Sequence, residues 1–274
     1  MLYDTMRVEE RLILKELRDL GANVALINID NVSLSLNNSG DFGVVLVRPM
    51  SHSKAGLVAR ILNIHGVMTI NKGLAIENSW NKAIAISTLA KAGIPTVPTK
   101  LLFSINAQGD GVSYPAIVKP IHGSWGGRLV SLVGNAEDLA MILRHKAVGD
   151  SYSRIAMIQP FIGDGTDYRV FVIGDEVVAS MVRKPSPGDW RSNVARGGIA
   201  HAIRLSADAY EIAIKAVKAL DLDYAGVDLL FSGGEGGYMV NEVNAIPEFK
   251  GLMSVSGINI ARKIAEYVIN TVRR

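Results

Sequence analysis

The chain has 274 residues, of which 49% are hydrophobic and 20% charged, with a formal net charge of +3; these values exclude a disordered or collagen-like chain, and the length predicts two domains or three small ones. The absence of cysteine excludes disulfides, thiolate metal sites and cysteine nucleophiles, and the five histidines lack the paired spacing of a zinc site. No stretch has the length and apolar character of a membrane-spanning helix or a signal peptide, so we expect a cytoplasmic protein that does not bind membranes.

Residues 1–77 alternate between helix and strand patterns. The predicted elements are a helix over 5–20, strands over 23–29 and 43–48, a helix over 53–65 and a strand over 67–71. Such alternation predicts a small α/β domain with a mainly parallel sheet. Arg48 ends one of these strands, where parallel sheets bind ligands, although an ordinary surface arginine fits the sequence equally well.

A second unit is predicted over residues 78–158. Its elements are a helix over 74–92, strands over 97–103, 114–119 and 129–133, a helix over 135–147 and a strand over 155–161. Lys119 stands inside an apolar strand, before Pro120 and the glycine-rich loop 121–128, and a phosphate partner explains this better than a solvated surface. The loop lacks Gly-Lys-Ser/Thr and opens a strand instead of a helix, which excludes a P-loop and argues against a dinucleotide fingerprint.

The first strands of the remaining residues, 159–274, bring two arginines together. The predicted elements here are strands over 167–174 and 176–183 and helices over 206–220 and 257–272. Arg169 and Arg183 lie near each other in such a hairpin, and paired cations beside a sheet suggest an anionic ligand. The polar, basic segment 189–198 is interpreted as a loop that covers this ligand or as a solvated connector.

A further hairpin carries three side chains with oxygen ligands. Strands over 225–231 and 238–243 are joined by a glycine-rich turn, and alternation sends Glu242 and Asn244 to one face, where the neighbouring strand can place Asp228. Acidic side chains in apolar strands are costly unless paired, and a divalent cation that carries nucleotide phosphates is a common partner. The alternative is a structural carboxylate capped by a helix or an arginine.

Charge is distributed unevenly along the chain. Residues 78–158 contain eight basic and four acidic residues, whereas the segments on either side are nearly balanced. A second basic cluster lies between Arg183 and Arg204. Because aromatic residues are only 6% of the chain, we do not expect nucleic-acid binding. Small anions or an acidic protein partner explain the basic charge better.

The motifs, taken in chain order, resemble those of the ATP-grasp ligase superfamily and its RimK-like branch. They are Lys82, Val118-Lys119-Pro120, Gly123-Ser124-Trp125-Gly126, Gln159-Pro160-Phe161-Ile162, Asp167-x-Arg169, Arg191-x-Asn193-x-Ala195-Arg196-Gly197-Gly198, Asp228 and Asn241-Glu242-Val243-Asn244. The resemblance extends to the LysX and ArgX subgroup through Leu2-Tyr3-Asp4, Arg7-x-Glu9-Glu10 and Pro247-Glu248-Phe249-Lys250-Gly251.

This resemblance implies an ATP-grasp fold of the α/β (α+β) class with three small domains, over 1–77, 78–158 and 159–274. ATP would bind between the central lid domain and the C-terminal domain. The nucleotide-binding residues would be Lys82, Lys119, Gly123, Ser124, Trp125, Gly126, Gly127, Gln159, Phe161 and Ile162. Mg²⁺ would bind Asp228, Glu242 and Asn244, while Arg169, Asn193 and Arg196 would steady the transferred phosphate and the carboxylate that receives it. Arg183, Glu248 and Phe249 are candidates for the amino-acid pocket.

The implied activity is an ATP-dependent carboxylate–amine ligation through an acylphosphate. Enzymes of the LysX and ArgX subgroup join α-aminoadipate or glutamate to the C-terminal glutamate of an acidic amino-group carrier protein in lysine or arginine biosynthesis. Sequence leaves the choice between these two amino acids open, because one methylene is worth only about 1–3 kcal/mol. The alternatives are a glutamate ligase acting on a coenzyme of the tetrahydromethanopterin type or on a protein C-terminus, and an ATP-binding regulatory protein without turnover. We also expect a homo-oligomer.

Overall fold

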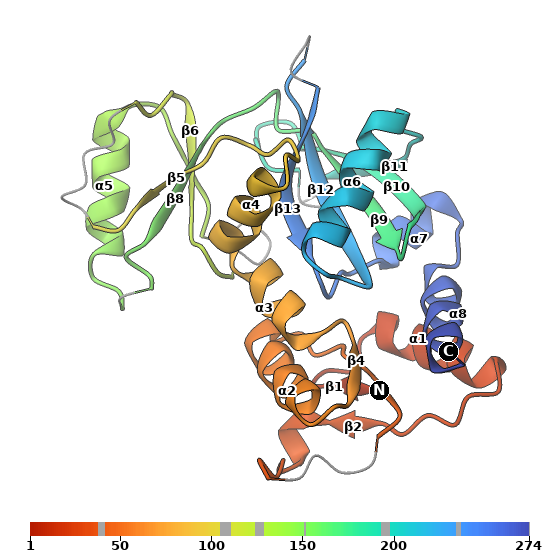
Figure 1. Ribbon diagram of the computed structural model, residues 1–274. Coiled ribbons are helices and arrows are strands. Elements are labelled where there is room, and N and C mark those ends of the chain that lie inside the picture. Colours follow the sequence, from red (N-terminus) through yellow and green to blue (C-terminus); the bar gives the residue numbers. More distant parts are fainter. Residues whose placement is uncertain are drawn as a thin grey trace.

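The computed structural model describes residues 1–37, 42–104, 111–123, 129–150, 152–192, 198–233 and 237–273. A five-stranded antiparallel sheet, a small N-terminal α/β unit and a separate four-stranded sheet make up the described molecule (Figure 1). No helix among these residues is both long and apolar enough to cross a bilayer.

The N-terminal unit has the parallel pairing that the sequence predicts. Its elements are β1 (Leu2–Tyr3), α1 (Val8–Asp19), β2 (Ile27–Asn28), a 3₁₀ turn (Ile29–Asn31), β3 (Val44–Leu46), α2 (His52–Ile64) and β4 (Met68–Ile70). β1 pairs with β2 and β3 with β4, all parallel, and a parallel bridge from Leu2 to Val47 joins the two pairs. The strand predicted over 23–29 is confined to Ile27–Asn28, and it ends there because the Asn28 side chain accepts from the Asp30 amide and turns the chain.

The helix predicted over 74–92 is two helices, α3 (Gly73–Trp80) and α4 (Lys82–Lys91). They meet at Asn81, whose backbone is extended and whose side chain accepts from the amides of Ala83 and Ile84. Asparagine at a helix N-cap replaces the missing intrahelical bonds in this way. The break leaves the Lys82 amide free to donate to the Ile121 carbonyl, 2.9 Å away. Lys82 is thereby tied to the segment that follows Lys119.

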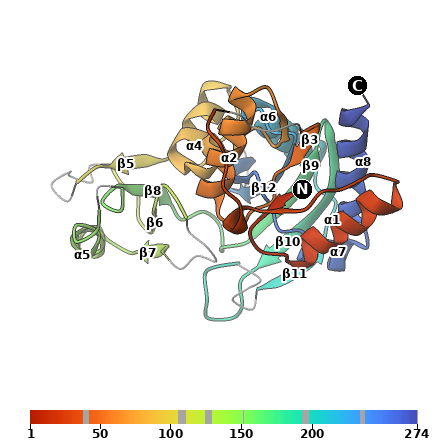
Figure 2. The ribbon, with the colours of Figure 1, turned by 90° about the horizontal axis from the view of Figure 1, so that it is seen from below.

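The four-stranded sheet is antiparallel, in the order β5-β8-β6-β7. Its strands are β5 (Lys100–Leu102), β6 (Ala116–Lys119), β7 (Ser131–Val133) and β8 (Ala156–Pro160), and α5 (Ala136–Lys146) covers one face. Val118, Ile158 and Leu139 belong to its own apolar core. The sheet therefore packs as a unit, and α4 and the five-stranded sheet both lie on the side of it that is away from α5 (Figures 1 and 2).

The five-stranded sheet has the order β11-β10-β9-β12-β13. Its strands are β9 (Asp167–Ile173), β10 (Glu176–Lys184), β11 (Ile199–Ala202), β12 (Tyr224–Phe231) and β13 (Tyr238–Asn244). Both predicted hairpins, β9–β10 and β12–β13, are confirmed as antiparallel pairs. The sequence analysis missed β11 and the short helix α7 (Lys250–Ser256), but the helices α6 (Ala207–Ala219) and α8 (Ile260–Val272) lie where predicted.

Both faces of this sheet are buried, and the alternation along β9 explains why. Val170 and Val172 join the core under α6, whereas Phe171 and Ile173 join the core formed with α1 and α8. Successive side chains of a strand point to opposite faces, so an apolar run is what a doubly covered sheet requires. Figure 2 shows α6 on one side of the sheet and α8 on the other.

Arg48 joins the N-terminal unit to the C-terminal half, and neither interpretation offered from its sequence position is correct. Its side chain is 0% exposed. It donates to Glu10 at 3.0 Å, to the Tyr224 hydroxyl at 3.3 Å and to the Pro247 carbonyl at 3.2 Å. Burial alone would raise the pKa of Glu10, but Arg7 and Arg48 together hold that pKa below its usual value. Arg48 is thus a buried structural cation.

We expect Arg48→Met to lower the free energy of unfolding by about 3–5 kcal/mol, because it leaves the buried Glu10 carboxylate without one of its two cations. Urea denaturation at pH 7 measures this loss. Arg60→Met is the control, since Arg60 pairs with Glu77 while both are about 40% exposed, and we expect it to cost less than about 1 kcal/mol. Equal losses in the two variants would contradict the structural role of Arg48.

Candidate functional site

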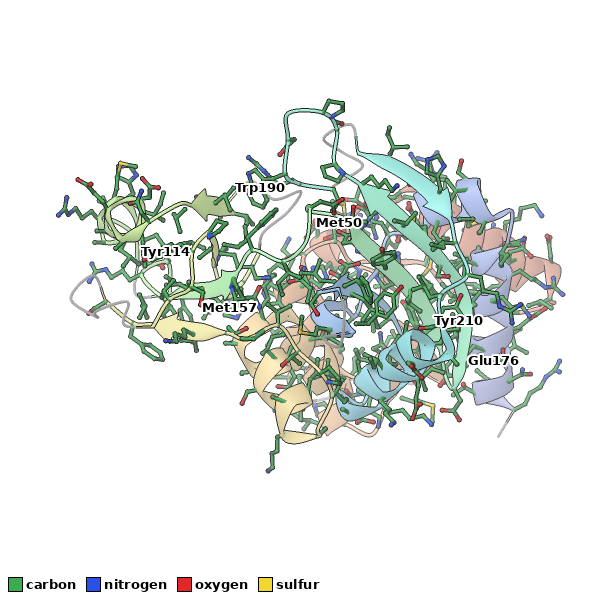
Figure 3. All side chains as sticks on the ribbon, turned by 90° about the horizontal axis from the view of Figure 1, so that it is seen from above. Met50, Tyr114, Met157, Glu176, Trp190 and Tyr210 are labelled. Atoms are coloured by element: carbon green, nitrogen blue, oxygen red, sulfur yellow. The ribbon has the colours of Figure 1, made fainter. Side chains whose placement is uncertain are left out.

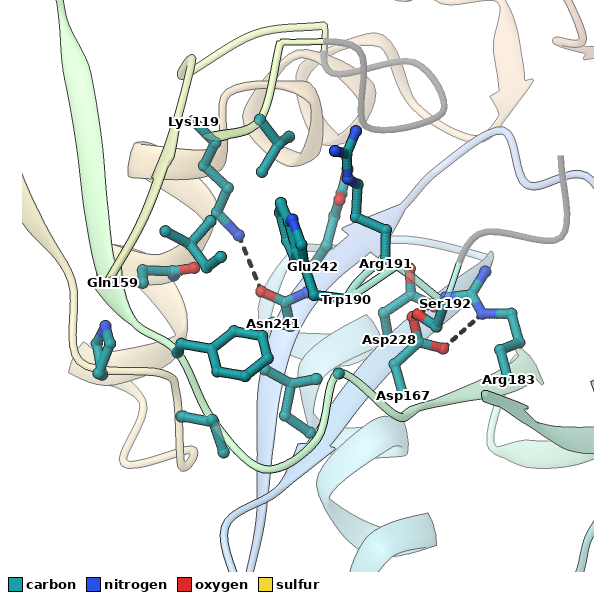
Figure 4. Close-up of a pocket in the computed structure, with 17 residues that line it drawn as sticks. Lys119, Gln159, Asp167, Arg183, Trp190, Arg191, Ser192, Asp228, Asn241 and Glu242 are labelled. Carbon is teal, nitrogen blue, oxygen red and sulfur yellow. Dashed lines mark hydrogen bonds and ion pairs between the residues drawn. The ribbon is translucent and has the colours of Figure 1, made fainter. Parts of the chain in front are cut away.

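A cavity of about 150 Å³ lies between the four-stranded and five-stranded sheets (Figure 4). One wall comes from β6, from β8 and from the segment that follows it, and the other comes from β9, β10, β12 and β13. Seven of the residues assigned from sequence line it: Lys119, Gln159, Phe161, Ile162, Arg183, Asp228 and Glu242. The fold therefore gathers in one place residues that are more than a hundred positions apart.

A β-bulge in β13 turns two consecutive side chains into this region. Asp228 pairs with Glu242, but the next residue of β12, Leu229, pairs with Val240, so Asn241 is the extra residue. Asn241 and Glu242 both line the cavity. Simple alternation would send Asn241 to the opposite face, and the sequence analysis therefore gave it no role. Because of the bulge, the adjacent residues Asn241 and Glu242 contact two different lysines, Lys119 and Lys82.

Each of these lysines has one partner on β13. The Lys119 ammonium donates to the Asn241 side-chain oxygen at 2.9 Å, and the Lys82 ammonium lies 3.1 Å from a Glu242 carboxylate oxygen. Burial lowers the pKa of Lys119 to about 8, although the negative charge of Glu242 opposes that shift. Both cations are buried, Lys119 on the cavity wall and Lys82 against Glu242 of that wall, which suits them to bind a polyanion.

Trp80 and His52 form an aromatic wall beside Lys82 that the sequence analysis missed. Their rings stack at 4.4 Å and 8°, and the Lys82 ammonium lies 5.8 Å from the Trp80 ring centroid. A Cβ at Gly123, whose φ is +56°, would lie only 3.4 Å from the Trp80 ring. The first glycine of the glycine-rich loop 121–128 thus lies in close contact with Trp80. The sequence feature that could have indicated this aromatic wall is Trp80, which stands two positions before Lys82.

Arginines and carboxylates form a buried network at the other end of the cavity. Asp228 accepts from the Arg169 Nε and Nη2 atoms, the latter at 2.8 Å, and lies 2.8 Å from Arg183 Nη2. Arg183 also donates to both oxygens of Asp167, which accepts from the Ser192 hydroxyl at 2.6 Å. Strand register brings them together, because Asp228 pairs with Arg169 and Arg183 with Asp167.

Within this network the pKa values of the two buried carboxyls shift in opposite directions. Burial would raise the pKa of Asp228, but Arg169 and Arg183 hold it below its usual value. Asp167 is less well compensated, and burial raises its pKa. The arginine cap proposed from the sequence as the structural alternative for Asp228 is therefore present in the structure. Asp228 therefore contacts these arginines and also lines the cavity.

The three predicted metal ligands lie together at the end of the β12–β13 hairpin. Asp228 is opposite Glu242, and the Asn244 amide lies 3.4 Å from an Asp228 carboxylate oxygen. The described residues contain no cluster of three or more histidine, cysteine, aspartate or glutamate side chains that could hold a metal. A cation here would thus bind two carboxylates and an amide oxygen. This all-oxygen set fits a hard ion such as Mg²⁺.

The other predicted site residues are placed as follows. Ser124, Trp125, Gly126, Gly127, Asn193 and Arg196 lie outside the described residues. Glu248 is 68% exposed and pairs with Arg7 at 3.3 Å. Phe249 is fully buried against Phe171 and lies under the Arg48 guanidinium, a placement that indicates packing.

Trp190, labelled in Figure 3, lies between the two sheets, and its ring meets that of Phe161 edge-on at 6.2 Å.

We expect Lys119→Met to stabilise the ligand-free protein at pH 7 by about 1–3 kcal/mol, because burial opposes the charge of Lys119 below its folded pKa of about 8. Between this pKa and the unfolded value of 10.5, the unfolded chain binds more protons at this position, so the wild type gains stability and the difference shrinks. Urea denaturation at pH 7 and pH 9.5 measures both effects. A destabilised variant, or a difference independent of pH, would contradict this explanation.

Comparisons with known proteins agree with this geometry. Residues 1–78 match the LysX preATP-grasp domain and residues 79–268 match the RimK-like ATP-grasp domain. The glutamate–LysW ligase ArgX of Sulfurisphaera tokodaii is 34% identical over 98% of this chain and 96% of its own. The α-aminoadipate–LysW ligase LysX of the same organism is 31% identical over 98% of each chain.

Solved structures show the same fold. A RimK domain ATP-grasp protein from Sphaerobacter thermophilus superposes with a TM-score of 0.76 at 21% identity, covering 97% of this chain and 98% of its own. The D-alanine–D-alanine ligase of Bacillus anthracis complexed with ATP gives 0.69 at 19% identity, covering 100% and 96%. The predicted ATP-grasp fold and family resemblance are confirmed. The chain belongs to the RimK-like ATP-grasp family.

Proposed function

We propose that this protein joins glutamate or α-aminoadipate, through its amino group, to the C-terminal carboxylate of an acidic carrier protein, using ATP and Mg²⁺. Family membership makes the protein an ATP-dependent carboxylate–amine ligase. The observation that carries the ATP and Mg²⁺ part of the proposal is the cavity that Lys119 lines together with the oxygen ligands Asp228 and Glu242. Phosphate-binding cations and cation-binding carboxylates are both needed where Mg·ATP reacts.

The proposed position of the nucleotide follows from the ammonium groups of two lysines and from the backbone N–H groups beside Phe161. Lys82 and Lys119 would bind phosphate oxygens. Pro160 has no N–H, and the Phe161 amide donates to the Pro115 carbonyl at 2.9 Å, so we propose Ile162 as the backbone donor to adenine. Phe161 and Trp190 would flank the base.

Asp228, Glu242 and Asn244 would hold the Mg²⁺ ions of the nucleotide. The ions supply positive charge that lowers the repulsion between the phosphates and the attacking carboxylate. Asp228 is already held by two guanidinium groups, so it must share its oxygens or release these arginines when the ligands arrive. Arg169 is then close enough to steady the transferred phosphate, the role we propose for it with Asn193 and Arg196.

The proposed reaction needs no covalent bond to the enzyme. A carboxylate oxygen attacks the γ-phosphorus of ATP, which releases ADP and leaves an acylphosphate; the amine then attacks the acyl carbon, loses a proton, and releases inorganic phosphate. The cavity residues position two anions and stabilise the charge that moves between them. Exclusion of water matters because an acylphosphate hydrolyses readily.

The carrier-protein part of the proposal rests on two observations. The relatives that match nearly the whole chain are named as LysW ligases, for glutamate in ArgX and for α-aminoadipate in LysX. Residues 78–158 also carry twice as many basic as acidic residues, which favours an acidic partner. Identity to the two kinds of relative is similar, so we propose both amino acids as substrates to be compared.

The test is incubation with ATP, Mg²⁺, a LysW-type carrier and single amino acids, with the intact mass of the carrier as the readout. We expect the carrier to gain the mass of one glutamate or one α-aminoadipate residue, with one ADP formed per addition. Nucleotide binding without any addition, across carriers and amino acids, would contradict the carrier-protein proposal and leave a ligase for another carboxylate or a regulatory protein.

We expect Glu242→Ala to reduce turnover at least about 100-fold while the protein stays folded, because it removes one metal ligand and the partner of Lys82. The same mass assay and circular dichroism measure the two properties. Glu211→Ala is the control, since Glu211 lies on the outer surface of α6 with an exposed side chain. Retained turnover in Glu242→Ala would remove the metal role, and unfolding would make Glu242 structural.

A further inference from the structure

The Lys119 ammonium is held by a neutral oxygen from the opposite sheet. Lys119 belongs to β6, Asn241 belongs to β13, and the 2.9 Å bond between them crosses the cavity (Figure 4). Among the residues that the structure describes, Asn241 is the one hydrogen-bond acceptor of this ammonium. An ammonium has three N–H donors, so two remain for a ligand.

The bulge in β13 exists at the residue that makes this bond. Without the extra residue, the side chain at position 241 would point to the other face of the sheet and could not reach Lys119. Bulges often re-aim a side chain next to an active site. The bulge therefore makes the hydrogen bond between Lys119 and Asn241 possible.

The chemistry of the acceptor matters as much as its position. A carboxylate at position 241 would pair with Lys119 and cancel the charge that attracts an anion, and it would stand directly beside Glu242. An amide oxygen fixes the direction of the ammonium and leaves its charge uncancelled. Lys82, in contrast, already faces the carboxylate of Glu242, so Lys119 is the less neutralised of the two lysines.

We propose that Asn241 is a positioning residue for the nucleotide: its neutral side-chain oxygen aims the Lys119 ammonium across the cavity and keeps its charge available for phosphate oxygens. This rests on the proposed function, which assigns phosphate binding to Lys119. Asn241 acts through Lys119 and takes no part in the chemical step. Its removal therefore changes the affinity for nucleotide more than the rate of the bound complex.

The test compares Asn241→Ala and Asn241→Asp with the wild type by calorimetric titration of Mg·ADP. We expect Asn241→Ala to weaken binding about 10-fold and the isosteric Asn241→Asp about 100-fold or more, with KM for ATP rising and kcat changing much less. Asn270→Asp makes the same chemical change on the exposed side of α8 and is expected to bind as the wild type does. Thermal unfolding identifies any variant that fails to fold. If Asn241→Asp does not fold, the affinity of Asn241→Ala for Mg·ADP decides the test.

A double-mutant cycle separates positioning from packing. In the Lys119→Met background we expect Asn241→Ala to change affinity less than about threefold, because the ammonium that Asn241 acts through is gone. A purely structural role predicts that the isosteric Asn241→Asp binds as the wild type does, or that the effect of Asn241→Ala persists without Lys119. Either result overturns the inference. Failure of the wild type itself to bind Mg·ADP would instead overturn the proposed function and this inference with it.

Discussion

The structure depends on burying charged groups inside an apolar sheet and giving each of them a polar partner. Asp228 is 6% exposed on β12, and the register of β9, β10 and β12 supplies it with Arg169 and Arg183. Removing one partner from such a buried pair costs about 3–5 kcal/mol, which is a large part of the stability of an ordinary domain. The antiparallel order of these strands is therefore tied to the charges that the site needs, and the site exists only when the sheet is correctly paired.

Polar contacts of buried charged groups also connect the two halves of the site. Lys82 and Lys119 come from outside the five-stranded sheet, and both end on adjacent residues of β13. The N-terminal unit is fixed to the C-terminal half by Arg48, which is buried between Glu10, Tyr224 and Pro247. These contacts are polar and largely buried. The family chemistry, which must bring two anions together, benefits from cations that are held in such positions.

Much of this could be predicted from sequence, and the exceptions have physical causes. The β12–β13 hairpin follows from apolar alternation and a glycine-rich turn, and a lysine inside an apolar strand was enough to suggest a phosphate site. The bulge at Asn241 could not be predicted, because a local register shift depends on the partner strand. The break at Asn81 was hidden by continuous helical periodicity on both sides. Arg48 was misinterpreted because its partners are far away in the chain.

The central claim is that the cavity between the two sheets binds Mg·ATP. A crystal structure with Mg²⁺ and a non-hydrolysable ATP analogue tests it most directly. The account predicts adenine beside Phe161 and Ile162, phosphate oxygens within hydrogen-bond distance of the Lys119 ammonium, and Mg²⁺ bound to Asp228 and Glu242. A nucleotide bound elsewhere on the molecule, or bound in this cavity with Mg²⁺ away from both carboxylates, would contradict it.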